Sequence, residues 1–371
     1  MKKTSYKWED LGVLARLSFF DVPDGAGEFH AVLQVEARRE LFAAQLERIY
    51  SAEERILHEL PNGTKAVMKR YFLSDATNQT PLMRKETDCA VSYIQQQPLD
   101  GSKIAVWIYF VNGMDVRTLD DGTGEARHDN IRHLWKMGLC CNDGDSFTQT
   151  RNVLENYEQS LENQGLTIEK NCLRTWFFVR DVDTQYAGMV QARRENFDTR
   201  GLTSSTHYIA STGIQGLPAD PKAIIQLGAY AVDGVKPEQI QYLHAASHLN
   251  PTYEYGVTFE RGTAVDYDDR RHVIISGTAS IDNRGKVLHV GDIDKQTRRM
   301  WENVEKLLEE GGATFDDVAQ IVVYLRDVAD FQRVNELFNA KFPDTPYVVT
   351  YAPVCRPEWL VEMECWAIVK K

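Results

Sequence analysis

The sequence lacks the features that mark several common classes of protein. Its six cysteines form no C-x-x-C pair and no framework spacing, which argues against structural zinc and against disulfides. No run approaches the roughly 20 apolar residues of a membrane-spanning helix, and the lysines of MKKTSYKWEDLG are followed by no apolar segment. We therefore expect a cytosolic protein with reduced thiols and no membrane partner.

Motifs for common cofactors are also missing. The stretch 122–124 reads Gly-Thr-Gly but lacks the third glycine and the strand–helix context of a dinucleotide site. There is no P-loop, no G-x-S-x-G elbow and no metal-ligand cluster, and His128 and His133 lie five residues apart on an expected turn and strand. The sequence thus predicts a protein that uses neither a metal nor an organic cofactor.

The charge balance is acidic. Lys and Arg number 42 against 54 Asp and Glu, a net charge of −12, which repels nucleic acid. An anionic substrate would therefore have to be held by local cations. The length of 371 residues, with 43% hydrophobic and 26% charged residues, is ample for two or three folded cores.

What the chain does contain is an internal repeat. Residues 149–165 read QTRNVLENYEQSLENQG and residues 296–312 read QTRRMWENVEKLLEEGG, and the Arg-His pair and glycine of 132–138 return in 271–277. A fainter third copy includes MKRYFLSD at 68–75. Agreement in order over strands and a helix indicates a duplicated structural unit. We expect three versions of one small domain.

The last copy gives the clearest order of elements. Apolar residues at helical spacing predict two amphipathic helices, and β-branched runs predict the strands. In order, these are a hairpin ending with 270–281, a helix over 293–310, a strand over 319–328, a helix over 330–342, and strands over 347–354 and 359–369. The order is ββαβαββ. The expected units span 1–112, 113–233 and 256–371, with a connector at 234–255.

These motifs resemble those of the YjgF/Rid (RidA-like) family. In 256–371, SGTASID, QTRRMWENVEKLLEEGGATFDDV, YLRDVADFQRVNELF and VEMECWA follow the family's order. The middle copy carries RTWFFVRDV, the pattern M-x-x-A-R-x-x-x-F over 189–197, and STHYIASTGIQG at 205–216, and is similar to the chorismatases. The resemblance implies an α+β fold of tandem YjgF-like (chorismate-mutase-like) units that form an intrachain pseudo-trimer, hence a monomer.

The resemblance places the catalytic acid in the third copy. Where the family carries a strand glutamate, this copy has Glu362, the second copy has Gln226, and the first has no acid in 105–111. Glu362 and Glu364 alternate with apolar residues, so both leave the same face of a strand. We expect Glu362 to be a general acid with a raised pKa, whereas an ion pair with a neighbouring arginine is the better reading of Glu364.

The family's imine deaminases carry an arginine that anchors a carboxylate, and here Tyr347, or Thr206 in the second copy, aligns with that arginine. This weakens a deaminase reading. Cys355 lies seven residues before Glu362, where hydroxybenzoate-forming chorismatases also have a cysteine. It is either a substrate contact or a small buried side chain, and no histidine is placed to activate it as a nucleophile.

Candidate substrate-binding residues come from strand-like runs near these positions. Arg261 and Arg174 interrupt apolar residues and could hold carboxylates, or form ion pairs between units. The stretch around Gly277 could offer backbone N–H groups to an anion. The full set of binding candidates is Arg261, Arg174, Gly277, Thr278, Ala279, Thr206, His207, Tyr208 and Tyr347.

The resemblance implies a chorismatase-like enzyme with one principal site between the second and third units. Glu362 would protonate the enol ether of chorismate, or of a related cyclic carboxylate, and pyruvate would be released without a cofactor. The alternatives are a Rid-type imine or enamine deaminase, and a small-molecule-binding protein that kept the fold without the reaction.

Overall fold

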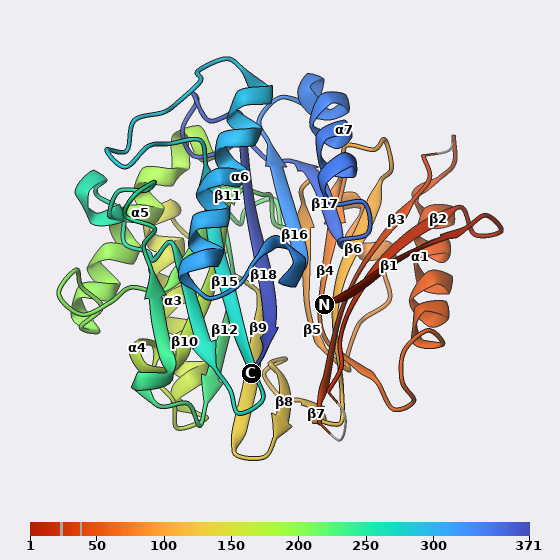
Figure 1. Ribbon diagram of the computed structural model, residues 1–371, viewed down its shortest axis with the longest axis horizontal. Helices are drawn as coiled ribbons and strands as arrows, with labels where there is room; N and C mark the ends of the chain where they lie inside the picture. The colour runs from red at the N-terminus through yellow and green to blue at the C-terminus, as the bar shows by residue number, and fades with distance from the viewer. Residues whose placement is uncertain (23–24, 38) are drawn as a thin grey trace.

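Three six-stranded mixed sheets with helices on their outer faces form the molecule. The computed structural model describes residues 1–22, 25–37 and 39–371. In Figure 1 the first unit, in red to yellow, lies at the right, the second, in yellow to green, at the left, and the third, in cyan to blue, between them. The predicted α+β fold with three repeated units is confirmed.

The first sheet has the order β1-β2-β3-β6-β4-β5. Its elements are β1 (Lys2–Trp8), β2 (Val13–Phe20), β3 (Gly27–Val35), α1 (Phe42–Leu57), β4 (Lys65–Leu73), α2 (Ala76–Gln79), a 3-10 turn (Thr80–Leu82), β5 (Ala90–Gln95) and β6 (Ile104–Asn112). Only the β4–β5 pair is parallel, as expected for two strands joined by a crossover.

The other two sheets repeat this order. The second unit has β7 (Asp115–Thr118), β8 (Gly124–His128), β9 (Ile131–Cys140), α3 (Ser146–Glu162), α4 (Ile168–Asn171), β10 (Cys172–Val179), α5 (Val182–Thr199), β11 (Ala210–Gln215) and β12 (Ile225–Asp233). The third has β13 (Ile240–Leu243), β14 (Gly262–Asp266), β15 (Arg270–Ala279), α6 (Ile293–Glu310), β16 (Val318–Leu325), α7 (Phe331–Lys341), β17 (Tyr347–Tyr351) and β18 (Val361–Lys370).

Helix α6 shows how the sequence produces these elements. Asp292 caps its first turn by accepting a hydrogen bond from Lys295 N, which satisfies one of the free N–H groups there. Met300, Val304 and Leu307 lie on one face and are fully buried. The helix ends before Gly311 and Gly312, the second of which has φ +78°, a conformation that glycine adopts at little cost.

Each unit has one edge strand more than the repeat predicted, namely β1, β7 and β13. Strand β13 pairs with β14 and lies within 234–255, the stretch expected to be a connector. The third sheet therefore begins inside that stretch. The short, half-exposed sequence of β13 lacks the apolar alternation that would have revealed it.

The three units pack in a cyclic order. Strand β5 lies against β9 of the second unit, β11 against β15 of the third, and β17 against β3 of the first. The inner faces of the sheets share one aromatic core, in which Tyr109, Tyr230 and Trp366 hold equivalent places on β6, β12 and β18. The Trp366 ring lies 5.6 Å from Tyr109 and 5.0 Å from Tyr230, both edge to face. This is the pseudo-threefold arrangement that the repeat predicted.

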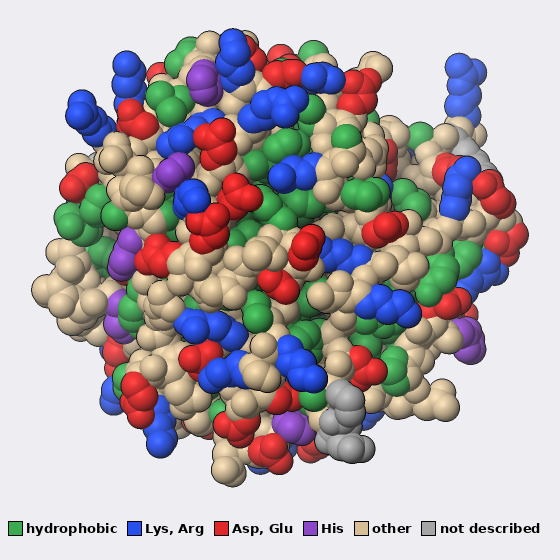
Figure 2. All heavy atoms as spheres, in the orientation of Figure 1, with side chains coloured by type: hydrophobic (Ala, Val, Ile, Leu, Met, Phe, Trp, Pro, Cys, Tyr) green, Lys and Arg blue, Asp and Glu red, His purple; other side chains and the backbone are tan. Residues whose placement is uncertain are grey.

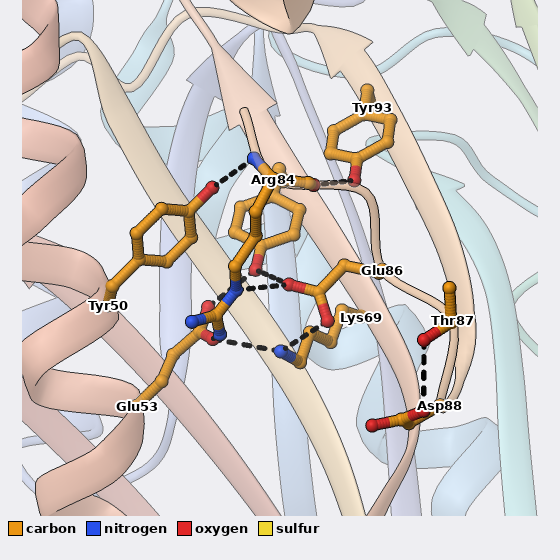
Figure 3. Close-up of polar contacts among 9 residues, drawn as sticks. Tyr50, Glu53, Lys69, Arg84, Glu86, Thr87, Asp88 and Tyr93 are labelled. Carbon is orange, nitrogen blue, oxygen red and sulfur yellow. Dashed lines mark hydrogen bonds and ion pairs between the residues drawn. The ribbon is translucent and has the colours of Figure 1, made fainter. Parts of the chain in front are cut away.

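The first unit departs from the others in the crossover between β4 and β5. Helices α5 and α7 fill this crossover in the second and third units, whereas the first has only α2 and a 3-10 turn. A cluster of charged and aromatic side chains beside α1 and β4 lies there instead (Figure 3). Lys69 Nζ donates to Glu53 at 2.8 Å and to Glu86 at 3.1 Å, and Arg84 Nη2 donates to Glu53 at 2.8 Å.

The cluster is largely shielded from water. The side chains of Lys69, Glu53 and Glu86 are 9% or less exposed. Burial would lower the pKa of Lys69, but the carboxylates of Glu53 and Glu86 raise it above its usual value, so the amine stays charged. The ion pairs hold the 84–89 loop against the sheet in place of a second helix.

Replacing Lys69 with methionine keeps the length of the side chain but leaves Glu53 and Glu86 short of one cation. We expect the free energy of unfolding to fall by about 3–5 kcal/mol at neutral pH, as when one partner of a buried ion pair is removed. Urea unfolding measures it. Lys7→Met is the control, because the Lys7–Glu9 pair is exposed to solvent and should contribute little to stability. Equal losses for the two variants would contradict a stabilising role for the cluster.

Candidate active site

A cavity of about 470 Å³ lies between the second and third units. Helix α5 and strand β11 form one wall, and β15, the 256–261 segment and the chain leading into β18 form the other. The cavity exists because β11 and β15 run side by side at this boundary. Glu362, Cys355, Arg261, Gly277 and Ala279 line it.

Glu362 is the acid of this cavity. It lies on β18 opposite Ala279 on one side and Tyr324 on the other, and it is 4% exposed. Within the described residues no hydrogen bond to its carboxyl is found. Burial raises the pKa of Glu362 to about 8, and the nearby Glu364 adds to this rise, against the opposing effect of Arg174 and Arg261. The carboxyl therefore holds a proton at neutral pH and can deliver it.

Gly277 makes room for that carboxyl. A Cβ at this position would overlap Glu362 Oε1, so any side chain would displace the acid. Residues 276–279 belong to strand β15 and form no anion-binding loop. The Gly277 N–H donates to Thr212 Oγ1 at 2.9 Å, and the Thr278 hydroxyl donates to the Ser276 carbonyl. Gly277 and Ala279 line the cavity, whereas the structure places Thr278 behind it.

Two buried arginines face the cavity from opposite walls. Arg261 donates from Nη2 to the Asn250 carbonyl at 3.0 Å and to Asn250 Oδ1 at 3.2 Å. Arg193, on α5, donates from Nε to Thr258 Oγ1 at 3.2 Å. Arg193 was not among the sequence candidates. The arginine of the 189–197 pattern could have indicated it. The direction of this side chain, however, depends on how α5 packs against the third unit.

Arg174 lies inside the molecule and does not line the cavity. Its Nη2 donates to Glu364 Oε2 at 2.7 Å, and the residue is 1% exposed. This is the ion pair between units that the sequence left open as the other reading. Thr212 stands between this pair and the cavity, because its hydroxyl donates to Glu364 and accepts from Gly277 N.

Thr206, His207 and Tyr208 line a separate, smaller cavity of about 190 Å³. The His207 ring stacks on Tyr242 with centroids 4.5 Å apart. Arg261 lines both cavities, so this group is a neighbour of the main cavity and not part of it.

Tyr347 lies at the boundary between the third and first units. The Arg16 guanidinium sits 4.3 Å from the centroid of its ring. Because the cyclic packing turns β17 toward the first unit, Tyr347 cannot face Glu362. The sheet registers pair Tyr347 with Ile321 and Ser211 with Thr175, which are equivalent positions. Ser211, not Thr206, is therefore its counterpart in the main cavity.

Cys355 lines the cavity beside Glu362. Burial raises the pKa of its thiol to about 12, with a further contribution from Glu362. The thiol is therefore protonated at neutral pH, which fits a packing or hydrogen-bonding group and not a thiolate nucleophile.

The other two boundaries between units differ at the position of the acid. Gln226 takes the place of Glu362 at the first–second boundary and donates to Ser92 Oγ at 2.7 Å. Ala105, on β6, holds the equivalent place in the first unit. Among these three positions, only the one on β18 carries an ionisable side chain.

The structure also bears on metal binding, membrane spanning and surface charge. Over the part of the chain that the structure describes, no group of three His, Cys, Asp or Glu side chains is placed to hold a metal ion, and no helix has the length and apolarity to span a bilayer. Figure 2 shows acidic and basic side chains interspersed on the face drawn. Arg193 and Arg261 are the buried cations that an anion in the cavity would meet.

Comparison with known proteins places the third unit in a family. The family model described as Endoribonuclease L-PSP matches residues 263–369. A RutC family protein of Pyrococcus abyssi is 35% identical over 97 residues, which is 26% of this chain and 76% of that protein. The chain belongs to the YjgF/Rid family. The 3-aminoacrylate deaminase RutC of Acinetobacter baylyi is 33% identical over 94 residues, 24% of this chain and 74% of that protein.

A longer similarity appears in the fold. A chorismatase crystal structure superposes with a TM-score of 0.64 at 17% sequence identity, covering 81% of this chain and 92% of that one. The similarity in fold extends over most of the chain and is therefore not confined to the third unit.

The pKa of Glu362 should appear in the pH dependence of stability. The native state keeps a proton up to about pH 8, whereas the unfolded chain releases it near the ordinary value of 4.5. Stability from this group is thus complete below pH 4.5 and is lost as the pH rises toward 8. Relative to wild type, Glu362→Gln should gain on the order of 3 kcal/mol between pH 5 and pH 8.

Urea unfolding at both pH values measures this difference. Glu358→Gln, which removes an exposed glutamate four residues away, is the matched control and should follow wild type. Parallel behaviour of Glu362→Gln and wild type would mean that the carboxyl is already ionised at pH 7.

Proposed function

We propose that this YjgF/Rid protein is a chorismatase-like enzyme that releases pyruvate from chorismate. The observation that carries the proposal is Glu362, a buried carboxyl with a pKa raised to about 8 inside a cavity that the buried Arg193 and Arg261 also line. A protonated acid beside cations suits a dianionic substrate that must be protonated. The chorismatase-like fold over most of the chain adds support.

The reaction begins with the proton of Glu362. Its transfer to the methylene carbon of the enolpyruvyl group converts the enol ether into an oxocarbenium ion. Water that adds to this ion gives a hemiketal, which breaks down to pyruvate and a dihydroxycyclohexadienoate. Elimination within the ring gives pyruvate and a hydroxybenzoate with no net uptake of water. In both cases Glu362 leaves as a carboxylate and must regain a proton.

The remaining cavity residues bind and orient the substrate in this proposal. Arg261 and Arg193 face the cavity from the third and second units and hold the two carboxylates, for which the planar guanidinium is well suited. Cys355, Gly277 and Ala279 shape the wall beside the acid. The cavity volume of about 470 Å³ falls within the range typical of small-molecule sites.

A Rid-type deaminase is the second candidate, favoured by the 33% identity to a 3-aminoacrylate deaminase. The residue at the position equivalent to Tyr347 argues against a deaminase. Ser211, which occupies that position in the main cavity, has no charge with which to anchor a carboxylate.

Pyruvate release from chorismate, followed with a coupled lactate dehydrogenase assay, tests the proposal. Wild type should release pyruvate, and Glu362→Gln should lower kcat/KM by about 10²–10⁴-fold, the usual contribution of general acid catalysis. Binding should survive, because the two side chains are nearly isosteric. Glu358→Gln should retain full activity.

Three other results would contradict the proposal. Ammonia release from 2-aminoacrylate without turnover of chorismate would identify a deaminase. Chorismate binding without pyruvate release would identify a binding protein. Full activity of Glu362→Gln would show that another residue supplies the proton.

A further inference from the structure

Glu364, two residues beyond Glu362, is surrounded by hydrogen-bond donors from the other two units. Its Oε2 accepts from Arg174 Nη2 at 2.7 Å and from Thr212 Oγ1 at 2.6 Å. Its Oε1 accepts from Trp176 Nε1 at 2.8 Å and from Arg70 Nη1 at 3.3 Å. Two cations and two neutral donors around a carboxyl that is 3% exposed favour its ionised form.

The position of the Arg70 guanidinium is energetically unfavourable. It comes from the first unit, is 0% exposed, and sits among the rings of Trp107, Trp176 and Phe178 at 4.6–5.2 Å. Its Nε and Nη2 make no hydrogen bond within the described part of the chain. The guanidinium is thus buried with two of its three nitrogens lacking a hydrogen-bond partner, a penalty that calls for an explanation.

The two glutamates point to the same side of β18, since side chains two residues apart in a strand share a face. A second negative charge so close to Glu364, in a region shielded from water, is unfavourable. A carboxylate fixed at residue 364 therefore keeps the proton on residue 362.

We propose that Glu364, held as a carboxylate by Arg70 and Arg174, is the positioning residue that keeps Glu362 protonated for catalysis. This inference rests on the proposed role of Glu362 as the acid. It assigns the first unit a part in a cavity that it does not line: Arg70 helps to fix the charge of Glu364. The first unit is then needed for the reaction although Ala105 takes the place of the acid on its own strand β6.

Other groups around Glu362 act on the same proton. Arg174 and Arg261 favour its ionised form, in opposition to burial and Glu364. The neighbouring ionisable side chains are Glu364 on β18, Arg174 on β10, Tyr324 on β16, Arg261 before β14, Cys355 and Arg356 before β18, and Tyr186, Arg193 and Arg194 on α5. Because Cys355 and Tyr324 have raised pKa values and stay neutral, Glu364 is the negative charge among them.

Glu364→Gln removes that charge and should make Glu362 more acidic. Activity needs the protonated acid, so the basic limb of the pH profile of kcat/KM should move down by at least one pH unit. At a pH above the limb, the variant should lose about tenfold or more relative to wild type, and acidic pH should restore the loss. A merely structural role would lower activity equally at every pH.

Glu364→Gln alone leaves Arg70 and Arg174 buried without their carboxylate, which destabilises the fold. The double variant Arg70→Met/Glu364→Gln removes one positive and one negative charge together, and methionine suits the aromatic surroundings of Arg70. It should unfold at a temperature closer to that of wild type, yet show the same acid shift of the basic limb. An unshifted limb in the folded double variant would overturn the proposal.

Infrared spectroscopy tests the proton without any substrate. At pH 7 the wild type should show the C=O stretch of a protonated carboxyl that Glu362→Gln abolishes. In the double variant this band should be lost at pH 7 and return at lower pH. If wild type has the band but does not turn over chorismate, the proposed reaction fails and the role of Glu364 stands. Retention of the band in the double variant at pH 7 contradicts the role itself.

Discussion

Two glutamates buried side by side on one face of β18 set the main constraint on this molecule. Ionising both carboxyls in a region shielded from water is energetically unfavourable. The surrounding side chains therefore determine which of the two carries the charge. The Glu364 carboxyl accepts hydrogen bonds from two arginines, an indole and a hydroxyl, whereas the Glu362 carboxyl faces a cavity. The division yields one carboxylate and one carboxylic acid, and the acid is the group that faces the space available to a ligand.

The cyclic packing of three similar units allows one boundary to specialise. Each boundary joins the fifth strand of one unit to the third strand of the next, and the second–third boundary places Glu362 together with the buried Arg193 and Arg261 around a cavity. Gln226 is tied to Ser92 at the first–second boundary, and Ala105 replaces the acid in the first unit. The first unit has instead diverged, with a reduced crossover helix and an ion cluster around Lys69 (Figure 3).

The sequence predicted the fold closely because the repeat and the apolar spacing are local properties. The helix expected over 293–310 occupies those residues, and the position of Glu362 followed from comparing the copies. The burial and the direction of individual side chains were harder to predict. Strand alternation gives the face of Arg174 but not whether it ends in the cavity or against Glu364. Tyr347 was misplaced because the cyclic packing turns β17 toward the first unit, and Arg193 was missed because only the packing of α5 directs it inward.

The crystal structure of the Glu362→Gln variant with chorismate bound tests the central claim most directly. The account predicts chorismate in the cavity between the second and third units. Its enolpyruvyl methylene carbon should lie within about 3–3.5 Å of the side-chain amide introduced at position 362, with a carboxylate on Arg193 or Arg261. Chorismate elsewhere, or with the enolpyruvyl group turned away from residue 362, would contradict it.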